Sequence, residues 1–418
     1  MWKKLFYILG PVLIAGLAVI VLFLTPINYR TANPTSVKKA STSLDARVLK
    51  GDIMKNYAKN ENYIPIIGSS ELSRMDPFHP SVVAQKYHWN NQPFLQGNPG
   101  TASLSQALNV NSMQMTKNNK AVFIISPQWF SQSGVSAAGF DYYFSPLQVD
   151  KFILESNTGD KKLNEYIANR ILELNPTVNY VKKESLRRIA DGKQITSNQR
   201  FYLKNISEPG LTNQDKLFGS IGIQNNQGLI DKEAKKLPDN YNYDELNDLA
   251  TNMAMDKSKN NDLQIGNKFF EKRLKKRISK YKNFDNHIDY LHSPEYNDFQ
   301  ALLYMFDRNH TQVMFVIQPV NRKWMKYTGM SPMVLNEFDA KVTYQLKSQG
   351  FDNIVDLTNV ENPNYISEDT IHIGWRGWLM VDDKLKGFYK DKKADPNKTR
   401  YHMNEKFLDK SWANNIDF

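Results

Sequence analysis

An uninterrupted apolar run near the N-terminus constrains this chain more than any other feature. Residues 5–24 comprise 20 residues without a charged side chain, in a chain whose mean hydropathy is only −0.56. A helix rises about 1.5 Å per residue, so this run can cross the roughly 30 Å hydrocarbon core of a bilayer. A buried core helix is the alternative, but the length and terminal position favour a membrane helix. The sequence therefore predicts one transmembrane helix, an anchor over residues 1–25.

The anchor is predicted to be uncleaved and to hold the rest of the chain outside the cytoplasm. Residues 23–26 (FLTP) lack the small side chains of a signal-peptide cleavage site. Lys3 and Lys4 precede the run and further basic residues follow it, so the charge count that sets orientation is nearly balanced. A very short, lysine-bearing N-terminus resembles a signal-anchor. We expect a single-pass protein of the cell membrane with its catalytic domain on the extracellular side.

Composition limits the kinds of site and partner. The 418 residues include 54 Lys and Arg against 43 Asp and Glu, a net charge of +11. Hydrophobic residues make up 41% of the chain, which excludes a mainly disordered protein. The absence of cysteine excludes disulfides, thiolate metal sites and a cysteine nucleophile. The charge fits nucleic acid, an anionic membrane or another polyanion. Because an anchor is a costly way to hold a DNA-binding protein, we expect membrane lipids and no nucleic acid among the partners.

Short apolar runs alternate with helix-like stretches along the body of the chain. The strand candidates are residues 64–67, 93–95, 121–125, 313–317 and 354–357. Helical spacing of apolar residues recurs at 103–115, 295–307, 332–346 and 377–388. Continuous β-branched runs are typical of strands covered on both faces, as in a parallel sheet. We therefore predict an α/β fold with a doubly wound, mainly parallel five-stranded sheet.

The other stretches indicate the domain organisation. Residues 26–45, rich in Thr, Ser, Asn and Pro, are predicted to be a linker, and residues 46–418 one α/β domain. Residues from about 130 to 265 are polar with helical pieces, which predicts a large helical insertion. A basic run at 272–277 continues to residue 282. It is either a solvated helix face or a contact surface for lipid headgroups or a phosphate-bearing polymer.

Ligand sites in open α/β sheets form beyond the carboxyl ends of the strands, so the residues that follow each strand are informative. Ser70 follows the first strand in a Gly-Ser-Ser-Glu turn. It is placed to act as a nucleophile, although serine is also a common helix N-cap. Gly100 follows the second strand, where it offers either an exposed amide or an ordinary turn. Gln128 follows the third strand and carries a side-chain amide.

Asp369 and His372 follow the fifth strand in an Asp-x-x-His pattern. A carboxylate three residues before a histidine can orient the imidazole, so that its other nitrogen takes a hydroxyl proton. The alternative is an Asp N-cap beside an incidental histidine. The remaining histidines show no metal-ligand spacing, so neither a metal nor a cofactor is predicted.

These four elements together resemble the SGNH (GDSL-like) hydrolase superfamily. The resemblance implies that Ser70 is the nucleophile and that Asp369 and His372 form the base pair. It also implies that Gly100 and Gln128 supply the oxyanion hole. Gln128 stands where the superfamily has Asn, and the residue before Ser70 is Ser instead of Asp. Loss of one oxyanion donor typically slows a reaction about 100- to 1000-fold.

Over essentially its full length the chain also resembles the DltD family of membrane-anchored proteins. The matching features are the N-terminal apolar run, the GSSE, GNPGTAS and SPQWF segments, the helical insertion and the late D-x-x-H followed by GWRGW. The resemblance implies the D-alanylation of lipoteichoic acid, a poly(glycerol phosphate), in Gram-positive bacteria. The partners that it implies are a D-alanyl carrier protein and a membrane O-acyltransferase of the same pathway.

Two classes of function remain open. The first is an extracytoplasmic serine acyltransferase or esterase in which His372, oriented by Asp369, deprotonates Ser70. The second is a non-catalytic, membrane-tethered scaffold that binds the carrier or the teichoic acid. A D-alanyl esterase would use the same residues as a transferase and would differ in admitting water to the acyl group.

Overall fold

A computed structural model of the chain describes residues 2–25, 32–113, 119–156 and 159–418, apart from the side chains of residues 2–6, 20 and 22. Five parallel strands form one sheet in the order β2-β1-β3-β4-β5. The strands are β1 (Tyr63–Gly68), β2 (Gln92–Gly97), β3 (Lys120–Ile125), β4 (Gln312–Ile317) and β5 (Ile354–Asp356). Each predicted strand is therefore present, and the order is that of a doubly wound α/β sheet.

The register of the sheet places the ends of its strands side by side. Gly68 at the end of β1 pairs with Gly97 at the end of β2, and Ile125 at the end of β3 pairs with Ile317 at the end of β4. All four strands run in the same direction, so the loops that follow them emerge at one edge. Ser70, Gly100 and Gln128 follow β1, β2 and β3 at this edge, whereas Asp369 and His372 follow β5, which also runs parallel to the other strands.

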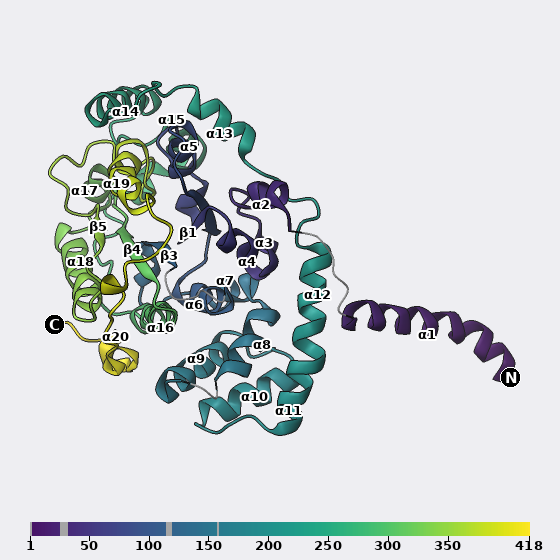
Figure 1. Cartoon of the computed structure of the whole chain (residues 1–418). Coiled ribbons are helices and arrows are strands. Elements are labelled where there is room, and N and C mark those ends of the chain that lie inside the picture. The colour runs from purple at the N-terminus through teal and green to yellow at the C-terminus, as the bar shows by residue number, and fades with distance from the viewer. Residues whose placement is uncertain (1, 26–31, 114–118, 157–158) are drawn as a thin grey trace.

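Side chains that alternate along the strands enter two hydrophobic cores, one on each face of the sheet. Phe123 and Phe315 enter one core, and Val122 and Val316 enter the other. The first face is covered by α6 (Ser103–Ser112), α16 (Glu295–Arg308) and α18 (Pro332–Lys347). The second face is covered by α5 (Pro80–Lys86), α13 (Gln227–Ala234), α14 (Tyr243–Lys257) and α19 (Trp375–Phe388). Figure 1 shows the sheet between these helices.

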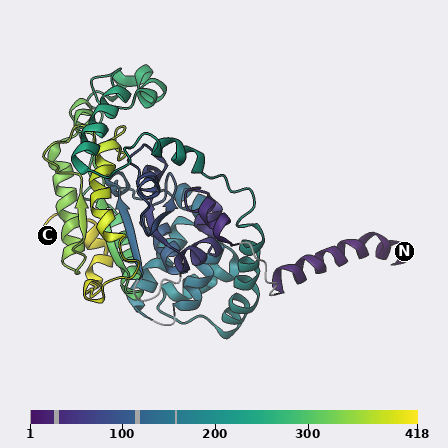
Figure 2. The same cartoon turned by 45° about the horizontal axis from the view of Figure 1, so that its top comes forward.

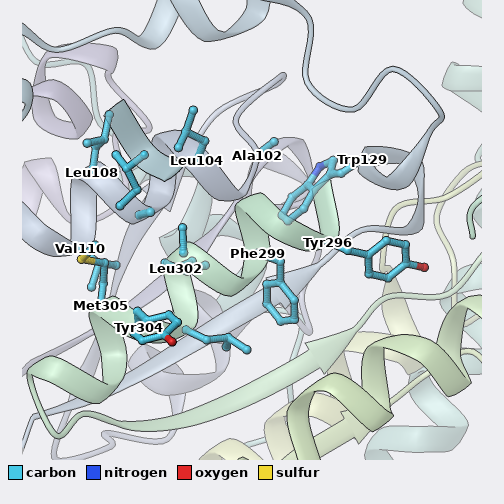
Figure 3. Close-up of a cluster of buried hydrophobic side chains, with 14 of the residues drawn as sticks. Ala102, Leu104, Leu108, Val110, Trp129, Tyr296, Phe299, Leu302, Tyr304 and Met305 are labelled. Atoms are coloured by element: carbon cyan, nitrogen blue, oxygen red, sulfur yellow. The ribbon is translucent and has the colours of Figure 1, made fainter. Parts of the chain in front are cut away.

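Aromatic packing dominates the first core. Figure 3 shows Phe299 and Tyr296 of α16 beside Trp129, which follows β3. Phe123 stacks on Phe299 with ring centroids 5.9 Å apart and meets Trp129 at the same distance. Buried aromatic rings bring large apolar areas into one cluster, so this contact fixes α16 against the sheet.

The described part of the segment between β3 and β4 consists of helices joined by turns and irregular stretches, and it contains no strand. Its helices are η2 (Pro127–Phe130), α7 (Ala137–Tyr143), α8 (Pro146–Glu155), α9 (Lys161–Leu174), α10 (Tyr180–Ala190), α11 (Ser197–Tyr202), η3 (Leu203–Ser207), α12 (Glu208–Phe218), α13 and α14, followed by α15 (Asn267–Phe269), η4 (Phe270–Leu274), η5 (Lys275–Tyr281) and α16. The helices α8 to α12 lie together at the lower side of the body in Figure 1.

A short helix, α17 (Arg322–Thr328), follows β4. The chain ends with three further short elements, η6 (Pro396–Lys398), η7 (Glu405–Leu408) and α20 (Lys410–Ala413). Trp412 of α20 is buried beside Phe407, with ring centroids 4.5 Å apart. The C-terminus thereby packs against the first core.

The predicted anchor falls in α1 (Trp2–Leu24), a helix that projects from the body (Figures 1 and 2). Asn213 of α12 donates hydrogen bonds to the Phe23 and Thr25 carbonyls at 2.7 and 3.0 Å, which joins the end of α1 to the body. Across the residues that the structure describes, no helix combines the length and the apolar character needed to cross a membrane. The transmembrane anchor stays a prediction.

Part of the predicted linker is folded. Residues 26–31 lie outside the described residues, but α2 (Pro34–Ala40) follows them and is succeeded by α3 (Ala46–Lys50) and α4 (Ile53–Asn60). Asn33 and Ser36 form a reciprocal cap at the start of α2. Val37 and Ala40 are fully buried in a small cluster with Phe94 of β2. Tertiary packing therefore attaches this stretch to the sheet edge.

Candidate active site

The turn after β1 holds the candidate nucleophile at the start of the 3-10 helix η1 (Ser70–Ser73). The buried Glu71 carboxylate folds back over this turn and accepts the Ser69 N–H at 2.5 Å and the Ser69 hydroxyl at 2.8 Å. A Cβ at Gly68 would lie 2.1 Å from Glu71 Oε1, so glycine leaves room for this carboxylate. These hydrogen bonds hold the turn in place, and Ser70 within it is half-buried.

The loop after β2 is fastened to the same turn. Thr101 Oγ1 donates to the Gly68 carbonyl at 2.8 Å, and Gln106 Nε2 donates to that carbonyl at 2.9 Å. Both side chains are buried, and buried polar groups are nearly always hydrogen-bonded. The loop that carries Gly100 is thereby held at the edge of the sheet where Ser70 lies.

The structure brings Ser70, His372 and Asp369 into one hydrogen-bonded row. Ser70 Oγ lies 2.7 Å from His372 Nε2, although the two residues are 302 positions apart in the chain. His372 Nδ1 lies 2.9 Å from Asp369 Oδ1 and 2.8 Å from Oδ2. Asp369 and His372 are buried. In this row the carboxylate orients the imidazole, and Nε2 is within reach of the Ser70 proton.

Asp369 is held as a carboxylate by several donors. It accepts the backbone N–H groups of Ile371 and His372, each at 3.1 Å, and it forms an ion pair with Arg74 at 3.0 Å. Burial raises the pKa of Asp369, but the hydrogen bond and charge of His372, the charge of Arg74 and the backbone donor together hold that pKa below its usual value. The carboxylate therefore stays ionised beside the imidazole.

Arg74 is a site residue that the sequence did not reveal. It lies four positions after Ser70, and its Nη2 is 3.0 Å from Asp369 Oδ2 and 3.4 Å from His372 Nδ1. Its guanidinium lies over the Phe269 ring, 5.6 Å from the centroid. Burial raises the pKa of the neighbouring Glu368 carboxyl, and the charge of Arg74 opposes that rise. Arg74 thus connects the Ser70 turn to the Asp369 loop.

Asp76 forms a second connection between the two halves of the site. Its Oδ2 accepts the N–H of Trp375, the first residue of α19, at 2.5 Å, and its Oδ1 accepts the Phe78 N–H at 2.7 Å. Burial raises the pKa of Asp76 to about 8 despite these donors. Trp375 and Trp378 are buried in the second core, so they pack the helix that follows His372.

The two candidate oxyanion donors are less tightly placed. Gly100 has a φ of 94°, which favours glycine, and its N–H makes no hydrogen bond to the described part of the chain. Gln128 lies in η2 with an exposed side chain, and that side chain makes no hydrogen bond to another described residue. No hydrogen bond among the described residues joins either one to Ser70. Their contribution to an oxyanion hole stays a prediction.

Local sequence patterns carried only part of the site. Glu71 lies three positions after Gly68, and Arg74 lies four positions after Ser70. This spacing places both residues near the turn but does not indicate which residues they contact. Within the described ranges, no group of three or more His, Asp or Glu side chains is arranged to hold a metal ion. The chemistry that the arrangement supports is proton transfer from a serine hydroxyl to a histidine.

The chain was compared with known protein families and proteins. A family model described as "DltD protein" matches residues 41–390. Protein DltD of Lacticaseibacillus rhamnosus is 42% identical over 414 residues, which cover 98% of this chain and 97% of the relative.

Two more distant relatives carry the same name. Protein DltD of Bacillus subtilis (strain 168) is 31% identical over 94% of this chain and 99% of the relative. Protein DltD of Staphylococcus aureus (strain NCTC 8325 / PS 47) is 29% identical over 90% of this chain and 94% of the relative. Since both the family model and these relatives cover most of its length, the chain belongs to the DltD family.

Proposed function

We propose that this protein is an SGNH-like serine acyltransferase that moves D-alanine in the D-alanylation of lipoteichoic acid. The observation that carries the proposal is the 2.7 Å contact between Ser70 Oγ and His372 Nε2, with Asp369 on the other imidazole nitrogen. Membership of the DltD family, together with the resemblance described above, supports D-alanine as the acyl group.

The first half of the reaction acylates the enzyme. His372 Nε2 takes the Ser70 proton while Ser70 Oγ attacks the carbonyl carbon of a D-alanyl ester or thioester. The carbon–oxygen or carbon–sulfur bond to the donor then breaks, and the imidazolium returns the proton to the leaving oxygen or sulfur. D-Alanine is left as an ester on Ser70.

The second half transfers the acyl group. A hydroxyl of the acceptor gives its proton to His372 and attacks the Ser70 ester, and the Ser70 oxygen recovers the proton as it leaves. In both halves the Gly100 and Ser70 amides, with Gln128, are the proposed donors to the oxyanion. Asp369 and Arg74 keep the imidazole in position throughout.

The proposed setting is the outer face of the cell membrane, with α1 as a single-pass anchor. Support comes from apolar side chains of α1 that are exposed in this structure, namely Tyr7, Ile8, Leu9, Val12, Leu13, Ile14, Leu17, Val19, Val21 and Leu24. Exposed apolar residues on a helix that projects from the body are suited to a lipid environment. The proposed partners are lipoteichoic acid, the D-alanyl carrier protein and the membrane O-acyltransferase of the pathway.

The proposal is tested by Ser70→Ala in cells that lack the native copy. We expect D-alanyl ester on lipoteichoic acid to fall to the background of the deletion strain, because the nucleophile is gone. Ser73→Ala is the matched control, since Ser73 is exposed on the same turn and its hydroxyl donates to the Ser70 carbonyl instead of contacting His372. Full incorporation with Ser70→Ala at normal protein level would show that the protein acts as a scaffold.

A further inference from the structure

A strongly basic segment lies beside the candidate active site. Between Asn267 and Asn283 the sequence has eight Lys or Arg residues and one acid, Glu271. We call residues 268–282 the basic segment. It comprises most of α15 together with η4 and η5, which follow one another without a break.

One side of the basic segment is apolar and packs on α17. The side chains on this side are Phe270, Leu274, Ile278 and Tyr281, spaced three or four residues apart. Tyr281 meets Trp324 of α17 with ring centroids 5.3 Å apart, and Tyr327 donates its hydroxyl to the Ile278 carbonyl at 2.9 Å. The apolar stripe therefore fixes the orientation of the segment and turns the charged side chains outward.

The charged side chains of the basic segment are exposed, and almost all of them are free to bind an anion. The exposed basic residues are Lys268, Lys272, Arg273, Lys275, Lys276, Arg277, Lys280 and Lys282. Of these eight, only Lys275 forms an ion pair with a described residue, Glu271 at 2.9 Å. Lys323 and Lys326 of α17 are also exposed next to this segment. A row of unneutralised cations of this kind attracts an extended anion more strongly than a single small one.

The basic segment begins at the catalytic row. Phe269 lies under the guanidinium of Arg74, which pairs with Asp369. One residue before the segment, the Gly266 N–H donates to the Glu368 carbonyl at 2.8 Å. An anion bound along the segment therefore approaches the loop that carries Asp369 and His372.

We propose that the basic segment binds the phosphodiester backbone of the acceptor polymer and leads its hydroxyls to Ser70. This inference rests on the proposed function for the nature of the acceptor. Each phosphodiester carries one negative charge, so consecutive repeats can meet consecutive Lys and Arg side chains. A polymer fits better than the lipid surface, because α15 lies at the top of the body in Figure 1, whereas α1 projects from its lower right.

The test measures binding of fluorescent glycerol phosphate oligomers, a dimer and an octamer, to the full chain in neutral detergent. In the wild type we expect the octamer to bind much more tightly than the dimer, and its affinity to fall steeply with salt. The variant K272Q/R273Q/K276Q/R277Q should bind the octamer at least about tenfold more weakly at low salt. Its log–log salt dependence should be shallower by up to about three, as for a flexible polyanion that loses four contacts.

The matched control removes the same charge elsewhere. K204Q/K232Q/K235Q/K390Q changes four exposed lysines that form no ion pair with a described residue. We expect it to bind the octamer like the wild type. Circular dichroism and the thermal unfolding midpoint check that both variants are folded.

Three outcomes would overturn the inference. These are an octamer affinity equal in the two variants, an octamer that binds no more tightly than the dimer, and inhibition of octamer binding by short-chain phosphatidylglycerol at matched phosphate concentration. The last outcome would assign the segment to lipid headgroups. Binding is also measured with Ser70→Ala, which lacks the nucleophile, so loss of the acyl chemistry and loss of polymer binding are separate results.

Discussion

At the scale of single residues, the candidate site depends on side chains that hold other site residues in position. Arg74 contacts both the carboxylate and the imidazole of the Asp369–His372 pair, and it directly follows the short helix that begins at Ser70. Its planar, permanently charged group suits a carboxylate better than the ammonium of lysine does. We infer that Arg74 positions the pair and does not itself contact the substrate.

Arg74→Gln should lower kcat for a soluble D-alanyl thioester by roughly ten- to a hundredfold, because small displacements of reacting groups carry large costs. Arg74→Lys keeps the charge and should recover part of the lost kcat. A normal kcat in Arg74→Gln would contradict a positioning role for Arg74.

At the scale of elements, the Ser70 turn depends on the close approach of Glu71 to Gly68. The Glu71 carboxylate is fully buried and bonded to Ser69, so it has little freedom to move aside. Ile124 of β3 closes the other side of Gly68, since a Cβ there would lie 3.4 Å from the Ile124 Cβ. The turn is therefore sensitive to a single added methyl group.

Gly68→Ala should destabilise the fold by about 1–3 kcal/mol, the usual cost of overpacking, and should abolish reaction at Ser70. Gly228→Ala is the control, because an added Cβ in α13 meets nothing within 4 Å and alanine is the better helix former. Thermal unfolding and acylation rates measure both effects. A Gly68→Ala protein with wild-type stability and rate would contradict the packing described here.

The strands could be predicted from the sequence because each contains a short apolar run. All five were found, and residues 121–125 differ from β3 by a single residue at its start. The helix α2 was missed because it is short and buries only Val37 and Ala40, and its contact with Phe94 depends on the folded sheet. A local sequence pattern cannot predict that tertiary contact.

The candidate site, like the fold, could be predicted from the sequence only in part. Ser70 and the Asp369–His372 pair were predicted because each follows a strand, and parallel strands deliver their ends to one edge. The partners of Arg74 lie about 300 positions away in sequence, so no local spacing reveals them. Gln128 was chosen by its position after β3, but its exposed side chain makes no hydrogen bond to a described residue.

At the scale of the whole molecule, charge and hydrophobicity are unevenly distributed. The projecting helix α1 leaves one side of the body, and the basic segment lies on another (Figure 1). In the proposed function, α1 holds the protein at the membrane and the basic segment faces the polymer. The net charge of +11 then serves substrate attraction more than membrane binding.

The anchor is tested by placing charges in α1. The full chain should stay with membranes during alkaline extraction, whereas Leu13→Arg with Leu17→Arg should release it, because each arginine near a helix centre opposes insertion by about 2.5–3.5 kcal/mol. Leu13→Ile with Leu17→Ile is the control and should remain membrane-bound. If the arginine variant also resists extraction, α1 does not hold the protein in the bilayer.

The most direct test of the central claim is detection of the acyl-enzyme. The full chain is incubated with D-alanyl-pantetheine, quenched in acid and digested, and the peptide that contains Ser70 is analysed by mass spectrometry. The account predicts a D-alanyl ester on Ser70 that is absent from Ser70→Ala and strongly reduced in His372→Ala. Absence of the ester from the wild type under rapid quench, or its presence on a different serine, would contradict the account.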